Sequence, residues 1–312
     1  MTDRSLRYHV DGEIVAAGSA GVSVHDRGFL YGDAVVETLR AYGGTVFRWD
    51  VHAERLDAAS AALSLAHGHS AAELKRRIDE TLAANRVDDA RLRLSITRGG
   101  DSGTLTPPAE SDPTLVIQVT PLPPGGSDGD PVWDAPATLQ TVKTRRIAAD
   151  AVPAATRTHN ALDRVLARAE LRVSDADEAV MLDGEGRVVG GATAALFALD
   201  GEALLAPGRD GTVADVLRTE VLDIAESEGI PIRDAPVTPD DLRRAAEAFV
   251  AHPVWGIRPV GTVDGIEVGG GPATTLIRGV FDRRVDRACY GGSDDADGSD
   301  RGGGADGSDA TE

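Results

Sequence analysis

Lysine is almost absent from this chain of 312 residues: of its 32 basic residues, only Lys75 and Lys143 are lysines. Acidic residues number 51, which gives a formal net charge of −19. A chain this acidic argues against nucleic acids and anionic membranes as partners, because both bind basic surfaces. An acid-rich, lysine-poor composition is typical of salt-loving archaea, whose salty cytoplasm screens the repulsion between acidic groups. We therefore expect a halophilic protein.

Other features are also scarce. Aromatic residues make up 4% of the chain, so its core must be mainly aliphatic. The single cysteine, Cys289, cannot form an internal disulfide, which is typical of a reducing cytoplasm. No apolar run reaches the roughly 18 residues of a membrane span, and MTDRSLRYHV lacks the apolar region of an export signal. We therefore expect a cytoplasmic protein.

The common catalytic and nucleotide-binding motifs are missing. There is no GxGxxG after a strand, no GxxxxGK[ST] loop to hold phosphate and no GxSxG. The histidines lack the spacing of metal ligands with cysteine or acidic residues, so no metal site is predicted.

A chain of this length exceeds one comfortable core, so two domains are expected. In residues 1–120, LRYHV and EIVAA flank Asp11-Gly12, while AVVETLRAY and TVFRW flank Gly43-Gly44, and both patterns predict hairpins. VHAERLDAASAALSLA and SAAELKRRIDETLAAN have helical spacing, and Ser70 and Glu73 are placed as a capping box. RLRLSIT and TLVIQVT follow as strands. This order predicts an α+β domain.

The segment PLPPGGSDGDP (121–131) predicts a linker, because it combines proline, glycine and polar residues without an apolar period. Residues 132–290 predict a second domain. Its elements are a strand in TLQTVKT, a helix within PAATRTHNALDRVLARAEL (153–171), and short strands around Asp183-Gly184 and Asp200-Gly201. Helices in VADVLRTEVLDIAESE and TPDDLRRA, the strand EAFVA and a helix in TTLIRGVFDRRVDRA complete it. The acidic tail 291–312 has no core-forming residue and is predicted to be disordered.

Residues 25–60, HDRGFLYGDAVVETLRAYGGTVFRWDVHAERLDAAS, resemble the N-terminal signature of the class IV aminotransferases. D-R-G-F-x-Y-G-D, E-T-x-R and H-x-x-R-L stand at that family's separations, and RLRLSITRG (91–99) and WGIRPVGTVDG (255–265) fit as well. The resemblance covers residues 6–290 and is closest to the aminodeoxychorismate lyases, with branched-chain aminotransferases in the same family. It implies the two-domain fold-type IV (D-amino-acid aminotransferase-like) fold, a homodimer, and pyridoxal phosphate (PLP) as cofactor.

PLP is an electron sink that needs a lysine for its Schiff base, an acid beside its pyridine nitrogen and anchors for its phosphate. By the resemblance, Arg55 is the phosphate-binding arginine, and Tyr31 and Arg98 lie near the substrate pocket. Arg157 stands at the lysine position, in R-T-H-N-A-L where the family has a pattern like K-T-x-N-Y-L. Gly190 stands at the position of the glutamate.

The phosphate turn also departs from the family. DVLR (215–218) replaces G-[IV]-T-R, so Val216 and Leu217 occupy the turn and Leu217 lacks the hydroxyl. In AHPVWG, Pro253 takes the position of a second hydroxyl and removes a backbone donor. Arginine cannot replace the lysine, because its guanidinium stays protonated and offers no lone pair to an aldehyde. Together these changes predict that the fold persists while the PLP site is lost.

Two hypotheses follow from these departures. The first is a non-catalytic homologue, a pseudoenzyme, that binds an anionic metabolite in the former cofactor cleft or associates with an active paralogue. The second is an active PLP-dependent aminodeoxychorismate lyase or amino-acid transaminase with a non-standard site. That site would use non-covalent PLP or Lys143, which strand alternation places on one face with Thr141 and Arg145.

Overall fold

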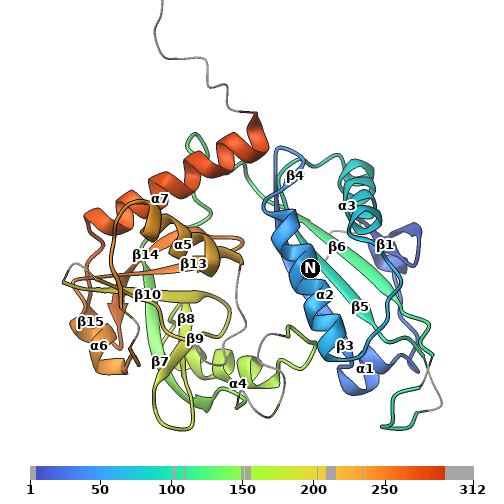
Figure 1. Cartoon of the computed structure of the whole chain (residues 1–312), viewed down its shortest axis with the longest axis horizontal. Coiled ribbons are helices and arrows are strands. Elements are labelled where there is room, and N and C mark those ends of the chain that lie inside the picture. Colours follow the sequence, from blue (N-terminus) through green and yellow to red (C-terminus); the bar gives the residue numbers. More distant parts are fainter. Residues whose placement is uncertain are drawn as a thin grey trace, which may run out of the picture.

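The computed structural model describes residues 5–100, 103–108, 110–148, 151, 156–201, 203–208, 216–233 and 235–291. Two halves, each built on a β-sheet, lie side by side (Figure 1). The predicted disordered tail lies outside the described residues from position 292 onward, and so does Asp215 of the phosphate turn. The α+β architecture expected from the sequence is confirmed.

The N-terminal half contains a six-stranded sheet in the order β2-β1-β6-β5-β3-β4. Its strands are β1 (Arg7–Val10), β2 (Glu13–Ala16), β3 (Ala34–Tyr42), β4 (Thr45–Val46), β5 (Ala90–Thr97) and β6 (Leu115–Pro121). Both predicted hairpins form, and Gly12 and Gly44 take the positive φ angles that these tight turns require. A short helix that the sequence patterns did not predict, α1 (Arg27–Tyr31), precedes β3.

Alternation gives this sheet two different faces. Leu39 and Leu92, paired across β3 and β5, are fully buried in the core beneath α2 (Trp49–Ala62) and α3 (Ala71–Asn85). Their neighbours Thr38 and Arg93 are also paired, and their side chains lie on the opposite face. The core therefore occupies one face, while the other is free to carry polar groups toward the C-terminal half.

Of the two hydrogen bonds of the predicted capping box at the start of α3, one forms. Ser70 Oγ accepts from the backbone N–H of Glu73 at 3.2 Å. The Glu73 carboxylate instead accepts two hydrogen bonds from Arg77, one turn further along the helix. The competing charged donor explains why the reciprocal bond is replaced.

The C-terminal half contains a nine-stranded sheet in the order β12-β11-β10-β13-β14-β7-β8-β9, with β15 paired to β14. Its strands are β7 (Ala137–Arg145), β8 (Glu178–Leu182), β9 (Val188–Gly191), β10 (Ala195–Asp200), β11 (Ala203–Leu205), β12 (Ile232–Arg233), β13 (Glu247–His252), β14 (Gly256–Val263) and β15 (Ile266–Glu267). Its α-helices are α4 (Leu162–Glu170), α5 (Val216–Ser227), α6 (Pro239–Arg244) and α7 (Pro272–Val285). The chain passes from the N-terminal sheet to the C-terminal sheet between Pro121 and Ala137, an interval that contains the predicted linker.

Large apolar side chains from both faces of this sheet are buried. Phe197 and Phe249 stack at a ring-centroid distance of 4.9 Å and pack with α5 and α7. Leu196 and Val250 alternate to the other face and pack with α6. The halves also touch through aromatic residues, since Phe47 of the N-terminal half meets Phe281 of α7 edge-on at 5.6 Å.

The helix predicted within residues 153–171 begins later than the sequence pattern suggests. Residues 153–155 lie outside the described part, and α4 begins only at Leu162. Thr158 accepts from the backbone N–H of Asn160, and the Asn160 side chain donates to Gly32 O. These hydrogen bonds hold the segment extended against the N-terminal half, so Arg157 does not stand at a helix terminus. No helix in the described part of the chain is long and apolar enough to cross a membrane.

Glu247 of β13 holds the start of α7. Its Oε2 accepts from the backbone N–H and the hydroxyl of Thr274, both at 2.8 Å. We expect Glu247→Ala to lower the free energy of unfolding by about 2–3 kcal/mol, because buried donors lose their acceptor. Urea unfolding followed by circular dichroism measures this loss. Glu267→Ala, on exposed β15, is the control and should change stability by less than about 0.5 kcal/mol; equal losses would contradict the assigned role.

Candidate functional site

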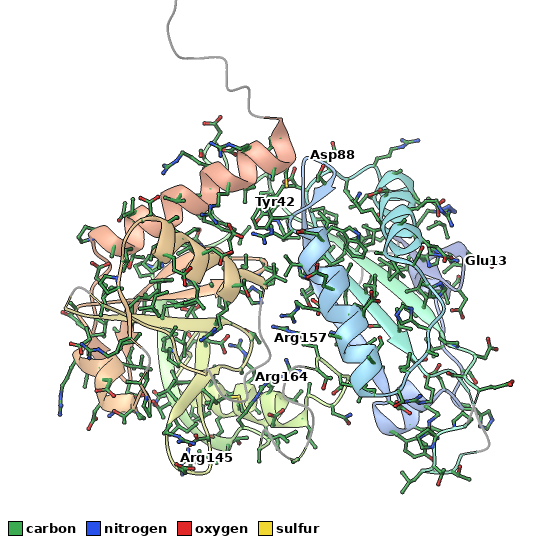
Figure 2. The ribbon with its side chains drawn as sticks, viewed as in Figure 1. Glu13, Tyr42, Asp88, Arg145, Arg157 and Arg164 are labelled. Atoms are coloured by element: carbon green, nitrogen blue, oxygen red, sulfur yellow. The ribbon has the colours of Figure 1, made fainter. Side chains whose placement is uncertain are left out.

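Residues 156–160 lie against the edge of β3 and join the two halves. The backbone N–H of Val36 donates to Arg157 O at 2.9 Å, and His159 Nε2 lies 3.0 Å from Ser95 Oγ of β5. These contacts hold the backbone at Arg157 and after it against the N-terminal sheet. Figure 2 shows Arg157 and Arg164 in the space between the halves.

An open cleft of about 620 Å³ lies between the N-terminal sheet and α4. Its polar lining is dominated by arginine: Arg91, Arg93, Arg157, Arg164, Arg168 and Arg172. Among the described residues that line it there is no lysine, aspartate or glutamate. This arginine cleft is therefore a concentration of positive charge in a strongly acidic chain.

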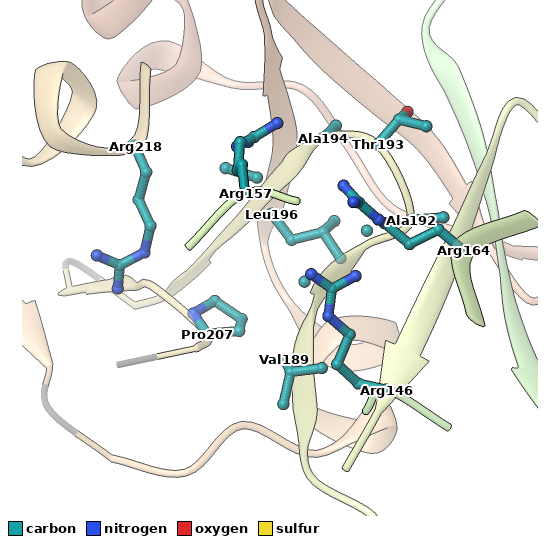
Figure 3. A pocket seen from close by; sticks show the side chains of 13 residues that line it. Arg146, Arg157, Arg164, Val189, Ala192, Thr193, Ala194, Leu196, Pro207 and Arg218 are labelled. Carbon is teal, nitrogen blue, oxygen red and sulfur yellow. The ribbon is translucent and has the colours of Figure 1, made fainter. Parts of the chain in front are cut away.

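A smaller pocket adjoins the arginine cleft, and Arg157 and Arg164 line both. Arg146 follows β7 and approaches Arg164, while Arg218 enters from α5 on the other side (Figure 3). The rest of the described lining is the end of β9, the start of β10 and Pro207, mostly small residues. The two spaces form one site with an inner and an outer part.

Burial and neighbouring arginines lower the pKa of two arginines in this site. Burial, with the charges of Arg146 and Arg157 acting in the same direction, lowers the pKa of Arg164 to about 10. Burial also lowers the pKa of Arg93, with added repulsion from Arg91 and Arg157. Both shifts mean that the folded protein disfavours these charges relative to water. An anion in the cleft would relieve this repulsion.

The Arg157 and Gly190 positions meet in this site, and Pro253 lines its outer part. Gly190 has a φ of 130°, a conformation that residues with a side chain rarely adopt. A Cβ there would have room, since the nearest atom is Ala194 O at 3.9 Å. A glutamate at this position is therefore disfavoured by the backbone conformation, and not by a lack of space for its side chain.

Arg55, the expected phosphate ligand, is engaged elsewhere. Its Nη2 lies 3.2 Å from Glu37 Oε1, and His52 Nδ1 lies 2.8 Å from Glu37 Oε2. Burial raises the pKa of Glu37, but His52, Arg55 and Arg157 lower it overall, so the carboxylate stays ionised. Arg55 is not among the described lining residues of either part of the site.

Tyr31 and Arg98, expected near the substrate pocket, do not line it in the described structure. Tyr31 donates from its hydroxyl to Gly103 O at 2.6 Å. Arg98 is buried and binds both carboxylate oxygens of Asp33, at 2.8 and 3.0 Å. It also donates to Leu63 O at the end of α2. Arg98 therefore holds the N-terminal half together, because its donors are used within the fold.

The remaining expected positions lie away from the open space. Val216 and Leu217 are buried at the start of α5, and Leu217 packs in the core with Phe197 and Phe249. Lys143 is exposed and outside the described lining, and Figure 2 shows nearby Arg145 at the edge of the molecule. The alternative based on Lys143 therefore has no geometric support.

Most of the cleft arginines were missed by motif-based reasoning. The signals were present: R-L-R-L in β5 puts Arg91 and Arg93 on one face, opposite the leucines. Arg164, Arg168 and Arg172 follow at intervals of four residues, which is one face of a helix. Neither pattern identifies a ligand until the fold brings the strand and the helix together.

The site does not fit covalently bound PLP. The described lining contains arginines but no lysine to form the Schiff base, and no aspartate or glutamate to pair with the pyridine nitrogen. No group of three or more histidine, cysteine, aspartate or glutamate side chains in the described part of the chain could hold a metal ion.

Comparisons with known proteins identify the family. The model of "Amino-transferase class IV" matches residues 34–263. A Methanocaldococcus jannaschii protein named "Putative branched-chain-amino-acid aminotransferase" is 34% identical over 263 residues, covering 83% of this chain and 88% of that protein. The branched-chain aminotransferase structure of Thermoproteus uzoniensis with norvaline has a TM-score of 0.81 at 28% identity, covering 89% and 94% of the two chains.

A 4-amino-4-deoxychorismate lyase structure from Pseudomonas aeruginosa is similar with a TM-score of 0.74 at 28% identity, covering 90% and 98% of the two chains. The chain therefore belongs to the class IV aminotransferase family and has its fold-type IV architecture. This family is PLP-dependent, and it contains both transaminases and lyases. The family and the fold expected from the sequence are confirmed.

The Asp33 carboxylate is central to the N-terminal half, since it binds Arg98 and, at 2.9 Å, Arg27. Burial raises its pKa, but these two arginines lower it overall. Its stabilising effect is therefore present above the unfolded pKa and lost as pH falls through the lower folded value. We expect Asp33→Asn to cost about 2–4 kcal/mol at pH 7, with the difference from wild type shrinking toward acidic pH.

Thermal unfolding between pH 3 and 7 measures this dependence. Asp50→Asn is the matched control, because Asp50 is exposed and its ion pair with Arg48 is 3.9 Å long. A loss for Asp33→Asn that stays constant down to pH 3 would show that its charge is not what stabilises the fold.

Proposed function

We propose that this class IV homologue forms no Schiff base with PLP and binds an anionic small molecule between its halves. One observation carries the proposal: Arg157, which the resemblance assigns to the lysine position, lies inside a cleft whose described charged residues are all arginine. Guanidinium groups suit phosphate and carboxylate ligands, which they bind through paired charge-assisted hydrogen bonds.

Neither lysine of the chain is placed to form a Schiff base in the cleft. The chain has two lysines. Lys75 lies on α3 and binds both carboxylate oxygens of Asp79, at 2.6 and 2.8 Å. Lys143 is exposed on β7, outside the described lining. A Schiff base needs a neutral amine within reach of the aldehyde, and neither lysine meets that condition.

The second hypothesis, an active transaminase or aminodeoxychorismate lyase, would have to use PLP held without a covalent bond. The inner arginines could attract its phosphate. The Glu178 carboxylate lies beside Gly191, but it accepts hydrogen bonds from Thr193 and is not among the described lining residues. No carboxylate in that lining would keep the pyridine nitrogen protonated, and Arg157 would not exchange protons at neutral pH. The geometry therefore favours binding over catalysis.

We expect no aldimine absorbance band when the protein is titrated with PLP, and no adduct in the mass spectrum after borohydride reduction. The buffer should contain concentrated potassium chloride, as the acidic composition suggests. A PLP adduct on Lys143 would contradict the proposal.

Arg157→Lys alone should give no substantial transaminase or lyase turnover, because Gly190, Leu217 and Pro253 are unchanged. Substantial turnover from this variant would show that only one residue had been lost.

We also propose a homodimer, as is typical of the family. Apolar side chains of α1 and α4 are strongly exposed, including Phe29 at 71% and Leu162 at 67%. Leu166 extends this surface along α4. Exposed apolar clusters of this kind mark interaction sites.

We expect a dimer by light scattering, and Leu166→Asp should shift it to monomer at micromolar concentration by placing a charge in the apolar contact. Leu276→Asp, on α7, is the matched control because it makes the same charge change at a side chain of similar exposure. A monomeric wild type, or a Leu166→Asp dimer as stable as the control, would contradict this interface.

A further inference from the structure

The arginines of the cleft form two facing rows. On α4 and the turn after it, Arg164, Arg168 and Arg172 are four residues apart, so the row spans roughly 12 Å at about 1.5 Å per residue. Arg91 and Arg93 lie on the same face of β5, about 6–7 Å apart along the strand. Both rows line the same cleft. Positive charge is therefore distributed along a line and is not confined to a single point.

Several of these charges are not neutralised within the described part of the chain. Arg91, Arg93, Arg164 and Arg172 have no carboxylate within 4.0 Å among the described residues. Arg168 differs, since it donates to Asp177 O and lies 3.7 Å from Glu178 Oε1. The rows therefore provide at least four cations for which a ligand could supply the counter-charge.

The neutral part of the lining offers little else to recognise. Its described residues include three threonines, several alanines and valines, Pro253 and His252, but no phenylalanine, tyrosine or tryptophan. A nucleobase is usually held by stacking on an aromatic ring, and none is offered here. The described lining therefore favours an anionic ligand, and in particular a ligand whose charges are spread along its length.

We propose that the ligand is a linear chain of linked phosphate groups, either a short condensed phosphate or a small metabolite that carries one. This inference rests on the proposed function, since it names the anion that the cleft binds. Linked phosphates place several charges in a line, so one end reaches the inner part near Arg157 and the rest lies between the two rows. The arginine lining focuses a positive potential in this cleft and attracts such anions at short range, whereas the acidic remainder of the surface repels them at longer range.

The test is calorimetric titration of the full-length protein with phosphate, pyrophosphate, tripolyphosphate, citrate and ATP. The buffer should lack magnesium and contain the least salt that preserves the far-ultraviolet spectrum. We expect affinity to rise roughly tenfold with each added phosphate, the equivalent of about one further charged contact. Tripolyphosphate should bind more tightly than citrate, and ATP should bind no better than tripolyphosphate.

Variants locate the binding. Arg93→Gln and Arg172→Gln should each weaken tripolyphosphate about tenfold and leave orthophosphate nearly unchanged, because these arginines lie in the outer part. Arg93→Lys keeps the charge and should retain most of the affinity, which separates lost binding from misfolding. Arg76→Gln, on the exposed side of α3, removes the same charge far from the cleft and should have no effect.

The outcomes separate this inference from the proposed function. Citrate binding as tightly as tripolyphosphate, with the same dependence on Arg93, would overturn the phosphate chain and leave an anion site. Tighter binding of ATP would overturn it in favour of a nucleotide. If every anion binds the Arg93→Gln variant as tightly as it binds the wild type, the two rows do not hold the ligand and the phosphate chain is overturned. If no anion binds the wild type, the anion-binding function itself fails.

Discussion

The attachment of residues 156–160 to the edge of β3 is the constraint on which the rest of the site depends. It is made by the backbone, through the Val36 N–H and Arg157 O, so it does not require a particular side chain at position 157. The attachment would therefore tolerate either a lysine or an arginine at this position, which is what the proposed loss of the Schiff-base lysine requires of the fold.

The second determinant is the two-faced character of the N-terminal sheet. Leu92 and its neighbours bury one face under α2 and α3, and this fixes Arg91 and Arg93 on the other. Packing of α4 on the C-terminal sheet similarly turns Arg164 into the same space. Core formation thus forces like charges together, and burial disfavours them further. In the absence of a ligand, we expect these crowded charges to lower the free energy of unfolding of the protein.

Sequence patterns predicted much of the fold, because hairpin glycines and helical periodicity are local signals. Arg157 and Gly190, which the family resemblance assigned to the cofactor site, line the same pocket. Arg98, which it assigned to the neighbourhood of the substrate, donates instead to Asp33 and Leu63 O within the N-terminal half. The arginine rows could not be predicted, since they arise from β5 and α4, which are distant in sequence and meet only in the folded chain.

The central claim is that the cleft arginines serve a ligand and weaken the free fold. Its most direct test is the unfolding temperature of Arg164→Gln without added anions, in moderate salt, beside the surface control Arg76→Gln. Because burial and then the charges of Arg146 and Arg157 lower the pKa of Arg164 to about 10, removal of its charge removes a destabilising desolvation and repulsion at neutral pH. The account predicts a rise of about 2–4 °C over wild type. A fall would mean that Arg164 stabilises the fold, and would contradict the account.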